Sequence, residues 1–390
     1  MICEERFHEI YRQDPEAISY CPYRICTLGA HSDHQLGKIN GFAIDKGINM
    51  AYKQKKNGVI ELVSLQFGKR AQFHIRSIPE SKCDDWADYL RGVSIELAKL
   101  YPLNTGLCGV IEGSLPIGGL SSSAAVTLCF LSALCKVNGI SLSVEEMIGC
   151  AMRAENSYVG VSSGKLDQSC EILSKKDNLL YLDTKDDSYE LIPTPSNMKP
   201  YDIAIFFSGV ERNLAASKFN MRVDECRSAA YALKAFSGME YGKFNQTFMR
   251  DIPRDVYDNY KNRLPESWRL RAEHFFSEYE RVENGVKAWK AGDIEAYGRL
   301  VFESGESSIS NWQSGSDELK KIHEIMTRTE GIYGGRFSGA GFKGCCMAIV
   351  NPEYSEKILD TVRNEYLKAF PHLKDKYLGV ICHSSDGVTL

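Results

Sequence analysis

The chain of 390 residues is too long for one small hydrophobic core, and two domains of about 150–200 residues each are expected. Its hydrophobic content of 43% and charged content of 25% are those of an ordinary globular protein, and a net charge of −4 gives no long-range attraction to nucleic acid or anionic lipid. No apolar run reaches the length of a membrane span, and acids such as Glu4 and Asp14 argue against a signal peptide. The 13 cysteines are scattered without a Cys-x-x-Cys pair, so neither a disulfide framework nor a zinc site is indicated and a reducing, cytoplasmic location is expected.

The beginning of the chain predicts a helical arm followed by several strands. Residues 1–20 form the arm, and a strand from Cys21 runs into a polar turn that ends at Gln35. An amphipathic helix is expected from Asp85 to about residue 101. Between the turn and this helix, strand patterns lie at 42–44, 48–52, 59–65 and 71–75.

A glycine-rich stretch over residues 113–120, preceded by a predicted strand at 109–113, is the most informative part of the chain. Three serines follow it and lead into the apolar run 124–134, which is long enough for a buried helix. Serines at a helix start can cap the first amides, and the remaining amides together with the helix dipole attract anions. Because glycine has no Cβ, a phosphate can approach this backbone closely. The stretch predicts a phosphate-binding loop, with an ordinary loop before a core helix as the alternative.

The remainder of the chain predicts a second, more helical half. Ser143 and Glu146 have the spacing of a capping box, which predicts a helix reaching about residue 158. The proline-containing run 192–200 is the predicted domain boundary, so that the domains comprise residues 1–195 and 196–390. The other elements expected are strands at 179–182 and 203–207, mostly helical residues over 214–300 with a charged stretch at 265–292, a strand-loop-strand over 333–350, a helix over 354–368 and a strand at 380–383.

Two segments look like nucleotide-binding motifs, but their spacing or the element that follows them does not match those motifs. Residues 160–166 have one residue too few between the glycines for a P-loop, and Leu166 stands where a Ser or Thr would bind magnesium. Residues 339–344 read Gly-x-Gly-x-x-Gly, but a strand pattern follows them, whereas the dinucleotide motif opens a helix. The polar run from His31 to His34 has no second cluster of ligands elsewhere, so a substrate-binding turn is preferred to a metal site.

Two acids, Glu155 and Asp167, stand out against their apolar neighbours. Phosphoryl transfer requires a phosphate cradle, a Mg²⁺ ligand and a group near the attacking hydroxyl. Carboxylate and hydroxyl oxygens suit Mg²⁺, which takes few protein ligands. Each acid alone is also explained as a solvated charge or a helix cap, and only their combination with the glycine-rich loop indicates catalysis.

Three segments, residues 22–47, 113–126 and 333–348, resemble the three motifs of the GHMP kinase superfamily in the expected order. Within that superfamily the chain is most similar to the galactokinase-like sugar 1-kinases. Further similarity at 86–92, 154–168 and 208–226 extends the resemblance over most of the chain. It implies an α+β fold of two domains, with the active site in the cleft between them and ATP as the phosphate donor.

The resemblance also implies roles for individual residues. Asp167 matches the catalytic carboxylate at the anomeric hydroxyl and Arg24 the cation beside it, while Ser123 and Glu155 match the Mg²⁺ ligands. The third motif would support the phosphate loop from the second domain. The residues expected around the ATP phosphates are Pro116, Ile117, Gly118, Gly119, Leu120, Ser121, Ser122, Ser123 and Ala124. Those expected at the sugar are Ala30, His31, Ser32, Asp33, Gly164, Lys165 and Phe219.

Departures from the galactokinase pattern point to the substrate. Ala30 stands in place of a glutamate, Phe219 in place of a tyrosine and Lys165 in place of an apolar residue, and the run 24–35 looks most like galacturonokinases. A glutamate near C6 would repel a substrate carboxylate by about 4 kcal/mol at about 4 Å and an effective dielectric near 20, which is roughly a thousandfold in affinity. Ala30 removes that repulsion. Lys165 either attracts the acid group or faces solvent.

The sequence therefore predicts a cytoplasmic, ATP- and Mg²⁺-dependent galacturonate 1-kinase. A galactokinase, or a kinase for another galactose derivative, is one alternative. A relative that binds sugar and ATP but signals without turnover is another, although intact Ser121–Ser123, Glu155 and Asp167 favour chemistry. A small sugar or sugar acid is the expected partner, with no nucleic acid or membrane, and the oligomeric state is left open with a monomer compatible.

Overall fold

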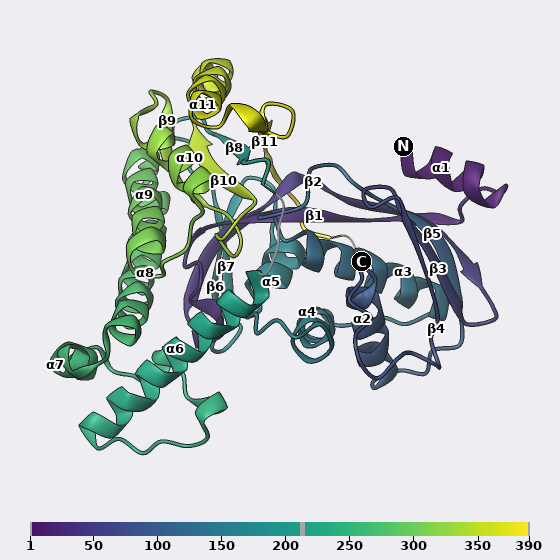
Figure 1. Cartoon of the computed structure of the whole chain (residues 1–390), viewed down its shortest axis with the longest axis horizontal. Coiled ribbons are helices and arrows are strands. Elements are labelled where there is room, and N and C mark those ends of the chain that lie inside the picture. Colours follow the sequence, from purple (N-terminus) through teal and green to yellow (C-terminus); the bar gives the residue numbers. More distant parts are fainter. Residues whose placement is uncertain (1, 211–214, 389–390) are drawn as a thin grey trace.

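The computed structural model describes residues 2–210 and 215–388, which form two β-sheets covered by helices (Figure 1). The larger sheet has the strand order β4-β3-β5-β2-β6-β7, and β1 and β12 also pair with β2. Its strands are β1 (Ala17–Leu28), β2 (Lys38–Lys55), β3 (Val59–Ser64), β4 (Lys69–His74), β5 (Gly106–Gly113), β6 (Asn178–Asp183), β7 (Tyr189–Pro193) and β12 (Ser384–Ser385). The smaller sheet is antiparallel, in the order β11 (Leu378–Cys382), β8 (Asp202–Phe207), β10 (Cys345–Val350) and β9 (Ile332–Phe337).

Helices pack on both sheets. Those of the N-terminal half are α1 (Ile2–Tyr11), α2 (Asp88–Ala98), α3 (Ser122–Asn138), α4 (Val144–Arg153) and α5 (Leu166–Leu173). Those of the C-terminal half are α6 (Ala215–Ser237), α7 (Arg254–Tyr260), α8 (Glu266–Ala291), α9 (Ile294–Ser310), α10 (Asp317–Arg328) and α11 (Ser355–Ala369). Short helical turns are η1 (Asp33–Gln35), the π-helical η2 (Ala154–Val159), η3 (Phe244–Gln246), η4 (Met249–Asp251), η5 (Lys261–Arg263), η6 (Pro352–Tyr354) and η7 (Pro371–Leu373). None of the described helices is long and apolar enough to cross a membrane.

The apolar run after the serines forms α3, as predicted. Leu128, Phe130, Leu131 and Leu134 are fully buried against the larger sheet, and Gly139, with a φ of 66°, ends the helix in the left-handed conformation. Burial of a side chain of this size stabilises a fold by roughly 1.5–3 kcal/mol. The helix therefore fixes the end of the preceding glycine-rich loop to the core.

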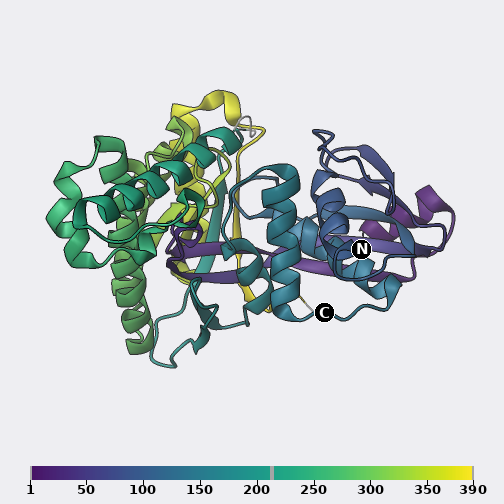
Figure 2. The same cartoon turned by 90° about the horizontal axis from the view of Figure 1, so that it is seen from below.

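Strands β1 and β2 carry the predicted substrate turn from one half of the molecule to the other. They pair antiparallel over most of their length, and Figure 2 shows them running from the N-terminal half towards the helices of the C-terminal half. The connection between them, which includes η1, lies beside α8, because Gly29 and Ala30 bond to side chains of that helix. The turn is thus held between the two halves.

Two predictions from the beginning of the chain are wrong. The helical arm ends at Tyr11 rather than near residue 20, because the Asp14-Pro15 step breaks the helix and the residues from Ala17 onwards pair with β2. The strands predicted at 42–44 and 48–52 are one strand, β2, whose exposed Asp45 accompanies a shift of register opposite Pro22 and Tyr23. A polar interruption in a long strand has the same pattern as a turn between two short strands.

The connection between β7 and β8, where the chain leaves the larger sheet for the smaller, contains the predicted boundary at residues 195 and 196. The exact boundary between the two domains remains a prediction. Strand β12 returns to the larger sheet and pairs with Ile44 and Ala43 of β2, so the C-terminal segment contributes to both sheets.

Candidate active site

The predicted phosphate loop connects β5 to α3 and has an unusual backbone. Gly118 and Gly119 have φ angles of 133° and 88°, and Ser121, just before the helix, has a φ of 60°. The side chain of Ser121 does not cap α3, contrary to the expectation from its position. Its Oγ instead donates a hydrogen bond of 2.6 Å to Asp167 Oδ2. The first amides of α3 therefore remain available to an anion.

Asp167 lies in the first turn of α5 and faces Arg24 of β1. Arg24 Nε donates to Asp167 Oδ1 at 2.7 Å, and Arg24 Nη1 donates to the carbonyl oxygen of Gly119 at 3.0 Å. Burial alone would lower the pKa of the Arg24 guanidinium, but the carboxylate of Asp167 raises it above its ordinary value. The pair of residues predicted to carry catalysis is thus in direct contact, with Asp167 the more exposed of the two, at 26% of its side chain.

Glu155 reaches the same cleft because the end of α4 widens into the π-helical turn η2. Such turns are common at functional sites, since they redirect one side chain without ending the helix. Glu155 is 4% exposed and accepts hydrogen bonds of 3.0 Å from Ser163 Oγ and from Gln168 Nε2. Ser123 also bonds to it. Burial and the nearby Asp167 raise the pKa of the Glu155 carboxyl above its ordinary value.

The predicted sugar turn lies against residues 164–166. A Cβ on Gly164 would stand 2.3 Å from Asp33 Oδ2, so only glycine allows this close approach. The same oxygen accepts a hydrogen bond of 3.2 Å from the Leu166 amide. Burial and Asp167 raise the pKa of Asp33 to about 6.

Most of the predicted site residues line one cleft, which encloses about 1090 Å³ including the solvent at its open side. It brings together, from the predicted set, Arg24, Ala30, His31, Asp33, Gly118, Gly119, Ser121, Ser122, Ser123, Glu155, Gly164, Asp167 and Phe219. Tyr89, Val161, Phe337, Phe342 and Lys343 complete its wall along with other residues that the sequence did not single out.

Six predicted residues lie outside the wall of this cleft. Lys165 forms an ion pair with Asp187, and its attraction of a substrate acid remains a prediction. Ser32 Oγ donates to the carbonyl of Gly29 at 2.6 Å and closes the turn. Pro116 and Ile117 line an adjoining groove with Gln66 and Phe67, and Leu120 and Ala124 are buried in the core.

Comparison with known proteins identifies this arrangement. Residues 85–175 match the GHMP kinases N terminal domain, and residues 286–368 match the GHMP kinases C terminal domain. A galacturonokinase of Arabidopsis thaliana is 36% identical over 389 residues, covering 94% of this chain and 91% of the relative. A galactokinase of Roseiflexus sp. (strain RS-1) is 30% identical and covers 98% of this chain and 95% of its own. The chain belongs to the GHMP kinase family.

Solved structures agree with this assignment. The crystal structure of Lactococcus lactis galactokinase complexed with galactose has a TM-score of 0.88 at 25% identity and covers 99% of this chain and 98% of that one. The Methanococcus jannaschii mevalonate kinase, with a TM-score of 0.66 at 17% identity over 95% of this chain and 98% of its own, shares the fold. The predicted two-domain α+β GHMP kinase fold is confirmed, and the protein is an ATP-dependent sugar kinase.

The third motif of the kinase packs directly on the phosphate loop. Ser338 Oγ donates a hydrogen bond of 2.7 Å to the carbonyl oxygen of Gly119, which also accepts from Arg24. A Cβ on Gly339 would lie 2.9 Å from the backbone of Gly119, and one on Gly344 would lie 2.8 Å from that of Gly118. All three family motifs therefore meet at one carbonyl oxygen.

Aromatic rings surround His31, which lines the cleft together with Phe219. The His31 ring stacks on the Trp312 ring, with a distance of 4.7 Å between the ring centroids and an angle of 5° between the planes. The centroid of the Phe219 ring lies 6.3 Å from that of His31. Burial, followed by the neighbouring His274 and Arg336, lowers the pKa of His31 well below its ordinary value. Its Nε2 is buried and has no hydrogen-bond partner among the described residues.

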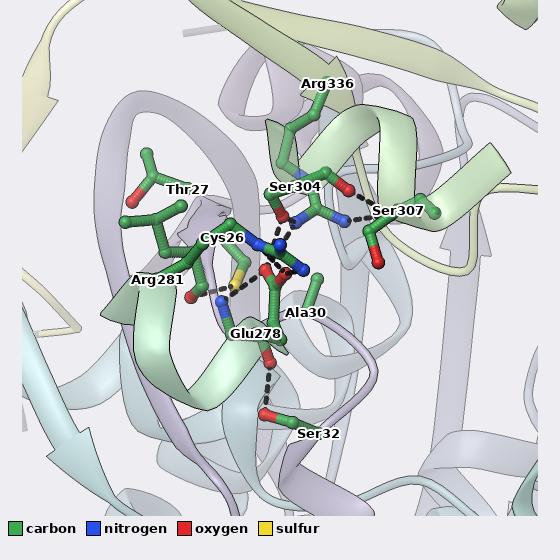
Figure 3. Close-up of polar contacts among 12 residues, drawn as sticks. Cys26, Thr27, Ala30, Ser32, Glu278, Arg281, Ser304, Ser307 and Arg336 are labelled. Carbon is green, nitrogen blue, oxygen red and sulfur yellow. Dashed lines mark hydrogen bonds and ion pairs between the residues drawn. The ribbon is translucent and has the colours of Figure 1, made fainter. Parts of the chain in front are cut away.

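Beneath the sugar turn lies a buried cluster that the sequence did not reveal (Figure 3). Glu278 of α8 accepts a hydrogen bond of 2.9 Å from the Gly29 amide and pairs with Arg281 at 2.7 Å and with Arg336 at 3.2 Å. Glu278 and Arg336 are fully buried. Burial would raise the pKa of Glu278, but the two arginines lower it to about 2. One carboxylate is thus matched by two guanidinium groups.

His274, one helical turn before Glu278, fixes the next residue of the turn. Its Nε2 lies 3.0 Å from the carbonyl oxygen of Ala30, and its Nδ1 lies 2.9 Å from Ser307 Oγ. A carbonyl oxygen can only accept, so Nε2 carries the proton and Nδ1 accepts from the serine. The sequence predicts residues 265–292 only as a charged stretch of a mostly helical region, and only their burial distinguishes His274 and Glu278 from surface residues.

Proposed function

We propose that this kinase transfers the γ-phosphoryl group of ATP to the anomeric hydroxyl of D-galacturonate, giving galacturonate 1-phosphate. The observation that carries the proposal is Ala30. It is 7% exposed and lines the cleft. By the resemblance of its motif, it takes the place of the glutamate of galactokinases. The identity of 36% with a protein named galacturonokinase points in the same direction.

The phosphate loop and two oxygen ligands suit Mg²⁺–ATP. The glycines and the free amides at the start of α3 would bind phosphate oxygens. The carboxylate of Glu155 and the hydroxyl of Ser123 bond to one another at the cleft wall, and a carboxylate and a hydroxyl are the hard oxygen donors that Mg²⁺ accepts. These two residues would hold the ion, which supplies charge neutralisation for the transferred group.

Asp167 would accept the proton of the attacking hydroxyl. Arg24 holds one of its oxygens and Ser121 the other, so that the carboxylate has one orientation. As the proton moves to Asp167, the sugar oxygen forms a bond to the γ-phosphorus and the bridging bond to ADP breaks. Arg24 also offsets negative charge on the transferred group.

The sugar would lie with its acid group towards Ala30 and the cluster beneath it. Arg281 and Arg336 both pair with Glu278 below the turn. The absence of a side-chain carboxylate at position 30 removes the repulsion that a glutamate there would exert on a substrate acid. A galactose hydroxyl gains much less from that absence, because it carries no charge.

A second groove adjoins the phosphate loop and would take the nucleotide base. Pro116 and Ile117 continue the loop into it, and Ile117 and Phe67 expose 40% and 48% of their surface there. Phe67 also stacks against Trp86 at 6.3 Å. An apolar, partly aromatic wall suits a planar heterocycle.

Galactose is the second candidate substrate, since the Lactococcus lactis galactokinase, solved with galactose, covers 99% of this chain. The test is sugar-dependent ADP release with galacturonate, galactose, glucuronate and N-acetylgalactosamine. The proposal requires the highest kcat/KM with galacturonate. A higher value with galactose contradicts it, and sugar binding without any ADP release would indicate the non-catalytic sensor instead.

A further inference from the structure

The cationic side chains that line the cleft differ in whether they already bind another residue. Within the described residues these are Arg24 and Lys343. Arg24 is occupied by Asp167 and by the carbonyl oxygen of Gly119. Lys343 forms no ion pair or hydrogen bond with any described residue. Its ammonium group is therefore free to bind an anion.

The position of Lys343 is fixed beside the phosphate loop. It precedes Gly344, and a Cβ on that glycine would lie 2.8 Å from the backbone of Gly118. The carbonyl oxygen of Gly344 accepts a hydrogen bond of 2.9 Å from the amide of Ser208, the residue that follows β8. Consecutive Cα atoms are about 3.8 Å apart, so the backbone of Lys343 stands next to the loop and its side chain lines the same cleft as Ser121–Ser123.

Negative charges outnumber positive charges in the cleft, so a bound triphosphate needs a further cation. Three carboxylates line it, those of Asp33, Glu155 and Asp167, against the two cations. A triphosphate adds several negative charges to this set, and Arg24 is already engaged. An ammonium group is a compact point charge on a flexible stem and binds phosphate without demanding a fixed geometry.

We propose that Lys343 is a nucleotide-binding residue whose ammonium group contacts the terminal phosphates of ATP. The proposal rests on the ATP-dependent part of the proposed function and not on the identity of the sugar. The alternative ligand in the same cleft is the carboxylate of the sugar acid, but the contact of Gly344 with Gly118 places Lys343 at the loop.

The test compares Lys343→Met, which removes the charge, with Lys343→Arg, which keeps it. Lys357→Met is the matched control, since Lys357 is exposed and pairs with Glu330 on the surface. Binding of ATP, ADP and AMP is measured by calorimetry without sugar, and kcat/KM for ATP is measured with saturating galacturonate and with saturating galactose. A hydrogen bond to a charged group predicts a loss of about 10- to 100-fold in ATP and ADP affinity for Lys343→Met.

The expected pattern has three parts. Affinity for AMP changes much less than affinity for ATP, kcat/KM for ATP falls equally with both sugars, and Lys343→Arg recovers most of the loss. Unchanged ATP affinity in Lys343→Met overturns the proposal. A loss that occurs only with galacturonate also overturns it and assigns Lys343 to the sugar acid. Because nucleotide binding is measured without sugar, a wrong substrate assignment would not affect this result.

Discussion

Ser121 and Asp167, which are 46 residues apart, share a hydrogen bond of 2.6 Å that joins the phosphate loop to the proposed base. Ser121 adopts a left-handed backbone with a φ of 60° to make it. Non-glycine residues are uncommon in this conformation, and it often marks a functional constraint. The predicted phosphate loop and the carboxylate proposed as the base are therefore positioned as one unit.

We expect Asp167→Asn to lower turnover by about 10²- to 10⁴-fold, because the amide cannot accept the hydroxyl proton. ATP affinity should remain close to that of the wild type. Ser121→Ala removes only one bond to the carboxylate and should cost much less. Turnover and calorimetric ATP binding are measured together, with a thermal melt to check folding, since Arg24 is buried beside the mutated group. Near-normal turnover of Asp167→Asn would show that Asp167 is not the base and has only a structural role.

Glu155→Gln should raise the Mg²⁺ concentration needed for half-maximal activity, because an amide oxygen is a weaker ligand than a carboxylate. Burial and Asp167 raise the pKa of Glu155, so a proton competes with the ion at a higher pH than for an ordinary glutamate. The Mg²⁺ requirement of the wild type should therefore increase as the pH falls. Glu145→Gln on the exposed start of α4 is the control. Identical Mg²⁺ titrations for the wild type and Glu155→Gln would remove Glu155 from the metal site.

The buried histidine of α8 predicts a pH dependence of stability. Burial lowers the pKa of His274 from 6.5 to about 4, so the unfolded chain binds a proton in this range and the folded one does not. Stability is full above pH 6.5 and falls as the pH drops towards 4. At about pH 5 the linkage amounts to about 2 kcal/mol.

The variant that tests this linkage is His274→Gln. Its amide can still donate to the carbonyl oxygen of Ala30 but cannot titrate, so it should lose less stability than the wild type between about pH 7.5 and about pH 5. The exposed His372→Gln is the matched control. Denaturant unfolding at the two pH values gives the difference directly. Equal losses for His274→Gln and the wild type would mean that the pKa of His274 is the same in the folded and the unfolded chain.

The loop between β5 and α3 could be predicted because its signals are local. A glycine-rich turn, three serines and an apolar run specify a loop followed by a buried helix, whatever the rest of the chain does. The rejection of residues 339–344 as a dinucleotide motif is confirmed in the same way, since strand β10 follows them. Ser121 is the exception within the loop. Its position suggests a helix cap, but a tertiary bond to Asp167 takes its hydroxyl.

The support beneath the sugar turn could not be predicted, because its members are far apart in the chain. Gly29, Glu278 and Arg336 meet only after both halves have folded. A charged residue inside a helical period looks the same whether it faces solvent or a buried counter-ion. Lys165 illustrates the same limit, since its partner Asp187 lies in the turn between β6 and β7 and nothing near Lys165 in the sequence indicates the pair.

Ala30→Glu should move the preference of the enzyme from galacturonate towards galactose. The new carboxylate would enter the cleft at the position that now lacks one and would repel the acid group of the substrate. At about 4 Å and an effective dielectric near 20, the repulsion reduces kcat/KM for galacturonate by up to roughly a thousandfold. The cleft is open to solvent on one side, and screening by solvent weakens such a pair, so the observed loss should lie below that limit.

Ala30→Gln separates this charge effect from a steric one. Glutamine has nearly the volume of glutamate but no charge, so it should lower kcat/KM for both sugars by a similar factor, whereas Ala30→Glu should lower the value for galacturonate selectively. Galactose should keep or gain activity in the Glu variant, because its C6 hydroxyl can donate a hydrogen bond to the carboxylate. The measurement is kcat/KM for both sugars in the wild type and the two variants. If Glu and Gln depress galacturonate equally, the site excludes bulk at position 30 and does not select charge. If the wild type already prefers galactose, the proposed role of Ala30 in accepting the acid group of galacturonate is wrong.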